Sequence, residues 1–185
     1  MPKIVAIVGS PRPNGNTNYL VDQALAEARL QGIEAEKIEL AKYTVNPCLG
    51  HENCSSFDTC RQQDDGAWII ERFRTADGVL LATPVYYYDV TAQMKAFIDR
   101  NYFLFRHGLK RNARSVGLII VAGGAGIDPT EQTLRRFAGG SSRGTHGQVH
   151  VVAGYASRPG DVKTNLALVE QSRELGRTMA NELLG

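Results

Sequence analysis

The feature that most constrains the fold is a strongly apolar run at residues 4–8, Ile-Val-Ala-Ile-Val, followed directly by a polar loop and then by a helical pattern. A run without polar alternation is typical of a strand buried on both faces, as in a parallel sheet. After the loop, one face of a helix is marked by Leu20, Val21, Ala24, Leu25 and Ala28. The pattern predicts strand, loop and helix, with the helix N-terminus aimed at the loop.

The loop reads Gly-Ser-Pro-Arg-Pro-Asn-Gly-Asn-Thr at residues 9–17. Free N–H groups and the dipole at a helix N-terminus both favour an anion such as phosphate. The loop adds donor side chains and one glycine that allows a close backbone approach: Ser10, Asn14, Gly15, Asn16 and Thr17. The simpler alternative is a turn in which Asn16 or Thr17 only caps the helix, but four polar side chains exceed what a cap needs. We therefore predict a phosphate-binding loop.

Two phosphate-binding motifs are absent from the loop, and their absence limits which phosphate ligands it could bind. It has no Gly-Lys-Ser/Thr, which excludes the nucleoside-triphosphate P-loop, and no Gly-x-Gly-x-x-Gly, so a dinucleotide fingerprint is not supported. Hydroxyl and amide groups with little fixed positive charge suit a terminal monophosphate ester such as that of FMN. Arg12 could neutralise this phosphate, meet the phosphate of an incoming nicotinamide cofactor, or simply be solvated.

Four more strands are predicted by apolar runs at residues 33–40, 78–83, 116–122 and 149–155, with helices between them. The last helix is expected to present Val162, Leu166, Val169, Met179 and Leu183. Strands alternating with helices predict a three-layer α/β domain with right-handed crossovers. We expect a flavodoxin-like fold, a five-stranded parallel sheet in the order 2-1-3-4-5 with helices on both faces, in a single domain over residues 1–185.

In such a sheet the ligand lies beyond the carboxyl ends of the strands, where three loops are expected, at residues 9–17, 83–90 and 122–127. The second loop offers an aromatic wall and backbone donors for a flat ring: Pro84, Val85, Tyr86, Tyr87, Tyr88, Asp89 and Val90. A tyrosine run on its own would instead favour half-buried packing residues. Gly123 and Gly124 would let the third loop approach the ring edge closely.

The loop at residues 9–17 and the segment at residues 83–100, Thr-Pro-Val-Tyr-Tyr-Tyr-Asp-Val-Thr-Ala-Gln-Met-Lys-Ala-Phe-Ile-Asp-Arg, together resemble the flavodoxin-like NADPH-dependent FMN reductases and iron–sulfur flavoproteins. The resemblance extends from the first strand to about Arg100. It implies FMN as cofactor and NADPH or NADH as electron donor. Electrons would pass through the flavin to a quinone, flavin, metal or protein acceptor, without a catalytic side chain.

The resemblance leaves two other functions open. One is an iron–sulfur flavoprotein-type electron carrier, and the other is a non-enzymatic FMN-binding sensor whose output is a mobile Gly/Ser-rich loop at residues 139–147. It also implies a homodimer or homotetramer. The aromatic segment at residues 101–106 is a candidate interface, because aromatics with arginine are enriched in interface cores. The alternative is that these aromatic side chains are buried in the core of the monomer.

An irregular segment at residues 41–65 contains all three cysteines, Cys48, Cys54 and Cys60. The iron–sulfur branch has a Cys-x2-Cys-x2-Cys run and a fourth cysteine a few residues on, and here His51 stands at the second cysteine position. Three cysteines and a histidine could hold an iron–sulfur cluster or structural zinc, or the motif could be metal-free. We expect FMN without a bound metal, because one ligand has changed.

Net charge, the length of the apolar runs and the cysteine count limit which partners and which cellular compartment we expect. A net charge of +2 over 185 residues is too small to indicate nucleic acid or an anionic membrane as partner. The apolar runs are shorter than a membrane span, and the sequence opens without a signal-peptide pattern. An odd number of cysteines argues against a disulfide framework, so we expect a cytoplasmic protein.

Overall fold

The computed structural model describes residues 1–139 and 147–185. Most of the predicted Gly/Ser-rich loop, residues 140–146, lies outside the described residues. Among the described residues, no helix combines the length and the apolar character needed to cross a bilayer.

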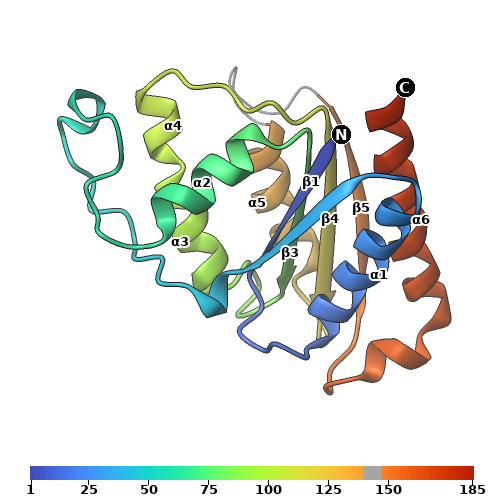
Figure 1. Cartoon of the computed structure of the whole chain (residues 1–185). Coiled ribbons are helices and arrows are strands. Elements are labelled where there is room, and N and C mark those ends of the chain that lie inside the picture. The colour runs from blue at the N-terminus through green and yellow to red at the C-terminus, as the bar shows by residue number, and fades with distance from the viewer. Residues whose placement is uncertain (140–146) are drawn as a thin grey trace.

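Five strands form one parallel sheet: β1 (Lys3–Val8), β2 (Glu34–Glu39), β3 (Gly78–Pro84), β4 (Ser115–Ala122) and β5 (Gln148–Tyr155). Their order is β2-β1-β3-β4-β5, which confirms the predicted order 2-1-3-4-5 (Figure 1). The three central strands carry the continuous apolar runs because both of their faces are covered. Strand β2, whose apolar run is interrupted by Glu36 and Lys37, lies at a sheet edge.

Helices cover both faces of the sheet and build two hydrophobic cores. Helices α1 (Asn16–Leu30) and α6 (Leu166–Leu184) pack against each other on one face (Figure 1). The other face is covered by α2 (Gly66–Thr75), α3 (Ala92–Arg100) and α5 (Ile127–Gly139). The short helix α4 (Tyr102–Arg106) follows α3 directly. The resulting three-layer fold is the flavodoxin-like one that the element order predicts.

The end of the chain differs from the sequence prediction. Val162 lies in a separate short 3-10 helix, η3 (Asp161–Thr164), and not on the last helix. The side chain of Asn165 then caps α6 by accepting a hydrogen bond from the Leu168 N–H at 3.1 Å. This cap makes Leu166 the first helical residue, where it is 76% exposed instead of buried.

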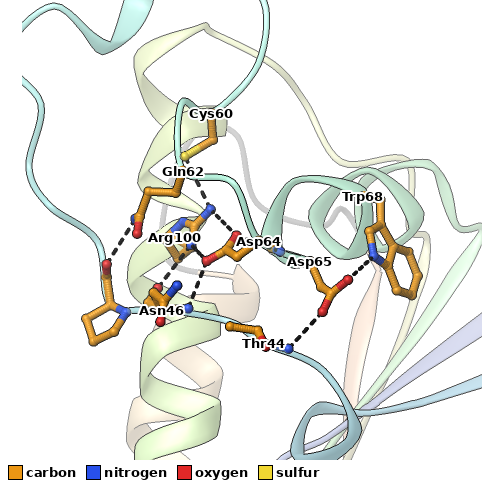
Figure 2. A network of polar contacts seen from close by, with 10 residues as sticks. Thr44, Asn46, Cys60, Gln62, Asp64, Asp65, Trp68 and Arg100 are labelled. Atoms are coloured by element: carbon orange, nitrogen blue, oxygen red, sulfur yellow. Dashed lines mark hydrogen bonds and ion pairs between the residues drawn. The ribbon is translucent and has the colours of Figure 1, made fainter.

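The cysteine-containing segment between β2 and α2 is anchored by a buried ion pair (Figure 2). It has little regular structure beyond η1 (Leu40–Lys42) and η2 (Cys54–Ser56). The Arg100 guanidinium, at the end of α3, bonds both carboxylate oxygens of Asp64, with Nη1–Oδ2 at 2.6 Å and Nη2–Oδ1 at 2.9 Å. Their side chains are only 1% and 0% exposed, respectively. The pair therefore fastens an otherwise irregular segment to a core helix.

Further contacts make Arg100 the centre of a network. Its Nη1 donates to the Asn46 carbonyl at 3.0 Å, and its Nη2 lies 3.3 Å from Cys60 Sγ (Figure 2). A Cβ on Gly66 would lie 2.8 Å from Arg100 Nη2, so the guanidinium fits only because this residue is glycine. Burial raises the pKa of Asp64, but hydrogen bonds from Arg100 and from the N–H groups of Asn46 and Gly66 outweigh it, and the pKa is lowered.

We predict that Asp64→Asn destabilises the protein by about 3–5 kcal/mol near neutral pH, because the Arg100 charge stays buried without its counter-charge. The folded-state pKa of Asp64 lies below its unfolded value of about 3.9, so the stabilisation is present above that pH and is lost as the pH falls through the folded pKa. Urea unfolding from about pH 6 to about pH 3 should therefore show a shrinking difference between wild type and variant.

The matched control is Lys95→Met, which breaks the exposed Lys95–Asp99 ion pair on the same helix. It should cost less than about 1 kcal/mol, because exposed pairs contribute little. A difference for Asp64→Asn that does not change with pH would contradict the assignment to the Asp64 charge.

Candidate functional site

The loops that follow β1, β3 and β4 meet at the carboxyl edge of the sheet, as the fold predicts. They enclose an open cleft of about 170 Å³. Its walls are formed by Ser10, Arg12, Gly15, Asn16, Thr17, Pro84, Val85, Tyr86, Val121, Gly123, Ala156, Ser157 and Pro159. The cleft therefore joins residues of all three predicted loops with a fourth segment that the sequence analysis did not include.

The first loop is folded around the carbonyl oxygen of Arg12. This oxygen accepts hydrogen bonds from Ser10 Oγ at 3.2 Å, from Asn18 Nδ2 at 2.9 Å and from the Gly15 N–H at 3.1 Å. Ser10 Oγ also accepts from the Arg12 N–H at 3.2 Å, and Ser10 is only 3% exposed. These bonds hold the loop in one shape before any ligand arrives.

Helix α1 begins at the cleft without a side-chain cap. Its N-cap is Gly15, and neither Asn16 nor Thr17 takes the capping role that the simpler alternative assigned to them. The N–H groups of the first turn have no partner within the helix, and the helix dipole makes this end positive. Thr17, which is buried, lines the cleft beside them. This end of the cleft thus presents N–H and hydroxyl donors suited to an anion.

Arg12, Asn14 and Asn16 of the first loop differ in whether their side chains can reach a ligand in the cleft. The Arg12 side chain is exposed and lines the cleft, a position open both to an anion and to solvent. Asn14 lies away from the cleft, in a neighbouring depression lined also by Asp22 and Lys163. The Asn16 amide is used up by bonds to the backbone of residues 156–162, so Asn16 can serve a phosphate only through its own N–H.

The first and second loops are fastened together by Thr91, which sequence reasoning missed. Its Oγ1 donates to the Gly9 carbonyl at 2.7 Å and accepts from the Met94 N–H at 3.2 Å, which also caps α3. Its N–H donates to Thr83 Oγ1 at 3.3 Å. A Cβ on Gly9 would lie 2.9 Å from Thr91 Oγ1, so glycine is needed for this close approach. One buried threonine therefore sets the distance between the two loops.

The tyrosine loop turns tightly and does not form the aromatic wall that we expected. Tyr86 and Asp89 pair through two backbone hydrogen bonds, at 2.9 and 3.2 Å, across a two-residue turn. Tyr87 and Tyr88 adopt left-handed φ values of 50° and 68°, and they are 98% and 65% exposed. Only Tyr86 lines the cleft, with Pro84 and Val85. Residues other than glycine are rarely held in this conformation, and they cluster at functional sites.

The backbone donors of this loop are fewer than predicted. The N–H groups of Tyr86 and Asp89 bond each other's carbonyl oxygens, and the Val90 N–H bonds Asp89 Oδ1 at 2.7 Å. Within the described part of the chain, the N–H groups of Tyr87 and Tyr88 have no acceptor. The Asp89 side chain also accepts from Thr133 Oγ1 at 3.1 Å, which ties the turn to α5. Two fixed donors therefore remain for a ligand.

In the third loop, a different glycine from those predicted makes the close approach. Gly123 lines the cleft, whereas Gly124 does not and has open space around it. Gly126 has a φ of +92°, and a Cβ there would lie 2.7 Å from Val85 Cγ1 and 2.9 Å from Tyr88 Cα. Gly126 is thus the position that lets the third loop contact the second.

Sequence reasoning missed the cleft residues Val121, Ala156, Ser157 and Pro159. Val121 belongs to a buried strand and gave no signal distinguishing it from core. The other three follow the carboxyl end of β5 in the run Ser-Arg-Pro-Gly at residues 157–160. The rule that ligands lie beyond the carboxyl ends of parallel strands could have included them.

The cysteine segment lies apart from this cleft. Cys48 is exposed, Cys54 and Cys60 are partly buried, and all three are free thiols. Across residues 1–139 and 147–185, no three His, Cys, Asp or Glu side chains come together in a way that could hold a metal ion. Burial, together with the nearby Cys60 and Cys48 thiols, raises the pKa of the Cys54 thiol. As placed here, Cys48, His51, Cys54 and Cys60 do not form a metal-ligand set.

Comparison with known proteins agrees with the geometry. The model of the family described as NADPH-dependent FMN reductase matches residues 2–158. An iron–sulfur flavoprotein of Methanocaldococcus jannaschii is 35% identical over 188 residues, which cover 96% of this chain and 95% of that protein.

Solved structures share the fold at low identity. An NAD(P)H:quinone oxidoreductase from Methanothermobacter marburgensis has a TM-score of 0.73 and 16% identity, covering 95% of this chain and 94% of that one. An FMN-dependent NADH-azoreductase from Bacillus anthracis, in complex with FMN, has a TM-score of 0.70 and 12% identity over 96% of this chain and 99% of that one. The family match spans the sheet and the three loops that form the cleft. On this match, the chain belongs to the NADPH-dependent FMN reductase family and has iron–sulfur flavoproteins among its relatives.

Proposed function

We propose that this protein binds FMN in the cleft at the carboxyl edge of the sheet and acts as an NAD(P)H-dependent oxidoreductase. The observation that carries the proposal is the uncapped N-terminus of α1, which faces a cleft lined by Ser10, Thr17 and the β3 loop. An uncapped, partly buried helix end needs acceptor groups, and the terminal phosphate of FMN supplies them. The names of the matched family and of its relatives support the same cofactor.

Each wall of the cleft has a part in this proposal. Ser10, Thr17 and the N–H groups at the start of α1 would hold the phosphate, with Arg12 at the rim. Pro84, Val85 and Tyr86 would flank the ring, and the N–H groups of Tyr87 and Tyr88 would be the donors left for it in this loop. When bound, FMN would supply the redox chemistry, taking a hydride from NADPH or NADH and delivering electrons to an acceptor. The protein's contribution is to bind and orient it.

A second candidate function is that of an iron–sulfur flavoprotein-type electron carrier. It is favoured by the 35% identity to an iron–sulfur flavoprotein across 96% of this chain. The carrier would take its electrons from a redox protein and not from a nicotinamide. The histidine at position 51, where the iron–sulfur branch has its second cysteine, counts against a cluster in this chain.

The remaining partners are also proposals. We infer a homodimer or homotetramer, because Tyr102 and Phe105 of α4 stack at 5.8 Å between ring centroids while both stay exposed. The acceptor would be a small molecule or a redox protein. Three free thiols fit a reducing compartment, so we propose a cytoplasmic location.

Nicotinamide turnover tests the function directly. Anaerobic addition of NADPH or NADH to the flavin-loaded protein should bleach the flavin absorbance, and adding a quinone should restore it. Bleaching only by a reduced ferredoxin-type protein would support the electron-carrier alternative. Flavin binding without reduction by either nicotinamide or by such a protein would support the sensor alternative.

The predicted phosphate site can be tested with Thr17→Val, which removes a buried hydroxyl and keeps the shape of the side chain. Its dissociation constant for FMN should rise about tenfold or more, because a charge-assisted hydrogen bond is lost. Riboflavin, which has no phosphate, should bind with unchanged affinity. Calorimetric titration of the apoprotein measures both, with Thr178→Val on α6 as control. Equal weakening of the two ligands would show that Thr17 does not contact the phosphate.

Metal binding can be tested with His51→Cys. We expect the wild-type protein, purified anaerobically, to contain FMN and no stoichiometric iron, sulfide or zinc. His51→Cys completes a four-cysteine set and should raise iron and sulfide towards about four of each per chain. Wild-type protein with about four irons and four sulfides would overturn the expectation and favour the electron carrier. Stoichiometric zinc in the wild type would overturn it in favour of a structural site.

A further inference from the structure

We propose that residues 156–160, the loop between β5 and η3, form a fourth wall of the cofactor cleft, and that Asn16 is the positioning residue that holds this wall in place. The inference rests on the proposed function, since it concerns how the same cleft retains FMN. It assigns a role to a segment that follows the sheet-edge strand β5, outside the three loops of the sequence prediction.

Asn16 joins two segments that lie far apart in the sequence. Its Nδ2 donates to the Arg158 carbonyl at 2.9 Å and lies 3.4 Å from the Ala156 carbonyl. Its Oδ1 accepts from the Gly160 N–H at 2.9 Å and lies 3.4 Å from the Val162 nitrogen. Both ends of one amide are thus occupied by backbone across about 140 residues of sequence. Because both its NH2 group and its oxygen are hydrogen-bonded, the Asn16 side chain fixes the two loops to each other.

The other side of the loop is fastened independently. Ser157 Oγ donates to the Gly123 carbonyl at 2.8 Å, which links the fourth wall to the third loop. The Ala156 N–H donates to the Ala122 carbonyl at 2.9 Å. The Asp161 carboxylate accepts from the N–H groups of Ser157 and Arg158, at 3.1 and 2.7 Å. The loop is therefore shaped internally by Asp161 and fixed to both of its neighbours.

The loop borders the end of the cleft where the phosphate is proposed to lie. Ala156, Ser157 and Pro159 line the same cleft as Ser10 and Thr17, and Asn16 is the first residue of α1, whose N-terminus faces that cleft. A wall held by hydrogen bonds keeps a ligand in place by slowing its release, and affinity differences among variants of one site lie mostly in the dissociation rate. Asn16 accordingly acts on FMN through the wall and not by touching its phosphate with the side chain.

Hydrogen exchange followed by mass spectrometry tests this on the full chain. In the wild type, FMN binding should slow amide exchange in residues 156–162. In the apoprotein, Asn16→Ala should speed exchange in the same residues, and it should raise the FMN dissociation rate about tenfold with little change in the association rate. Ser157→Ala removes only the second anchor from an exposed residue and should act in the same direction. The double variant should lose less than the sum of the two single effects, because both act on one loop.

The outcomes separate this inference from the proposed function. Wild-type apoprotein that binds no FMN would refute the proposed function. Binding of FMN without protection of residues 156–160 would refute the fourth wall alone. If Asn16→Ala weakened FMN binding while exchange in residues 156–162 stayed at the wild-type rate, Asn16 would be a direct ligand and the positioning role would be wrong.

Discussion

Parallel hydrogen bonding between β1, β3 and β4 is the constraint on which the rest of the structure depends. The register sets Val8 beside Ala82 and Pro84 beside Val121, so three chain segments leave the sheet at nearly the same level. Parallel sheets occur almost only where both faces of the strands are covered. Here the helices cover them, with one hydrophobic core on each face. The cleft therefore exists because the sheet is parallel and buried, and its walls are loops that need no regular structure of their own.

Hydrogen bonds between the loops turn this common edge into one cleft. Thr91 fastens the first loop to the second, Gly126 allows the third to pack on the second, and Ser157 joins the third to the segment after β5. Asn16, at the start of α1, hydrogen-bonds the backbone of the segment after β5 and so links it back to the first loop. A ligand would meet donors whose positions are set before it binds, which lowers the ordering cost of binding.

The network around Arg100 has a separate purpose. It satisfies the polar groups of an irregular segment with a buried ion pair, and breaking such a pair is costly because one charge is left alone. The segment that bears the cysteines is thus held by protein groups, with Cys60 beside the guanidinium. Because protein groups hold the segment, its fold does not depend on a bound metal. The effect of His51→Cys on metal binding can therefore be measured separately from folding.

The sequence by itself determined the strand runs, the helix between the first two strands, the sheet order and the three loops at its carboxyl edge. Hydrophobic periodicity is a local property and the reversal of strand order is a topological one. Both can be predicted from the sequence without knowing where the side chains lie. The positions of individual site residues were decided by tertiary structure. Tyr87 and Tyr88 are exposed and do not line the cleft, because they form a two-residue turn with left-handed φ values. Asn16 faces the segment after β5 because two backbone carbonyls and two N–H groups lie within its reach. Such partners are about 140 residues away, and only the folded sheet brings them together.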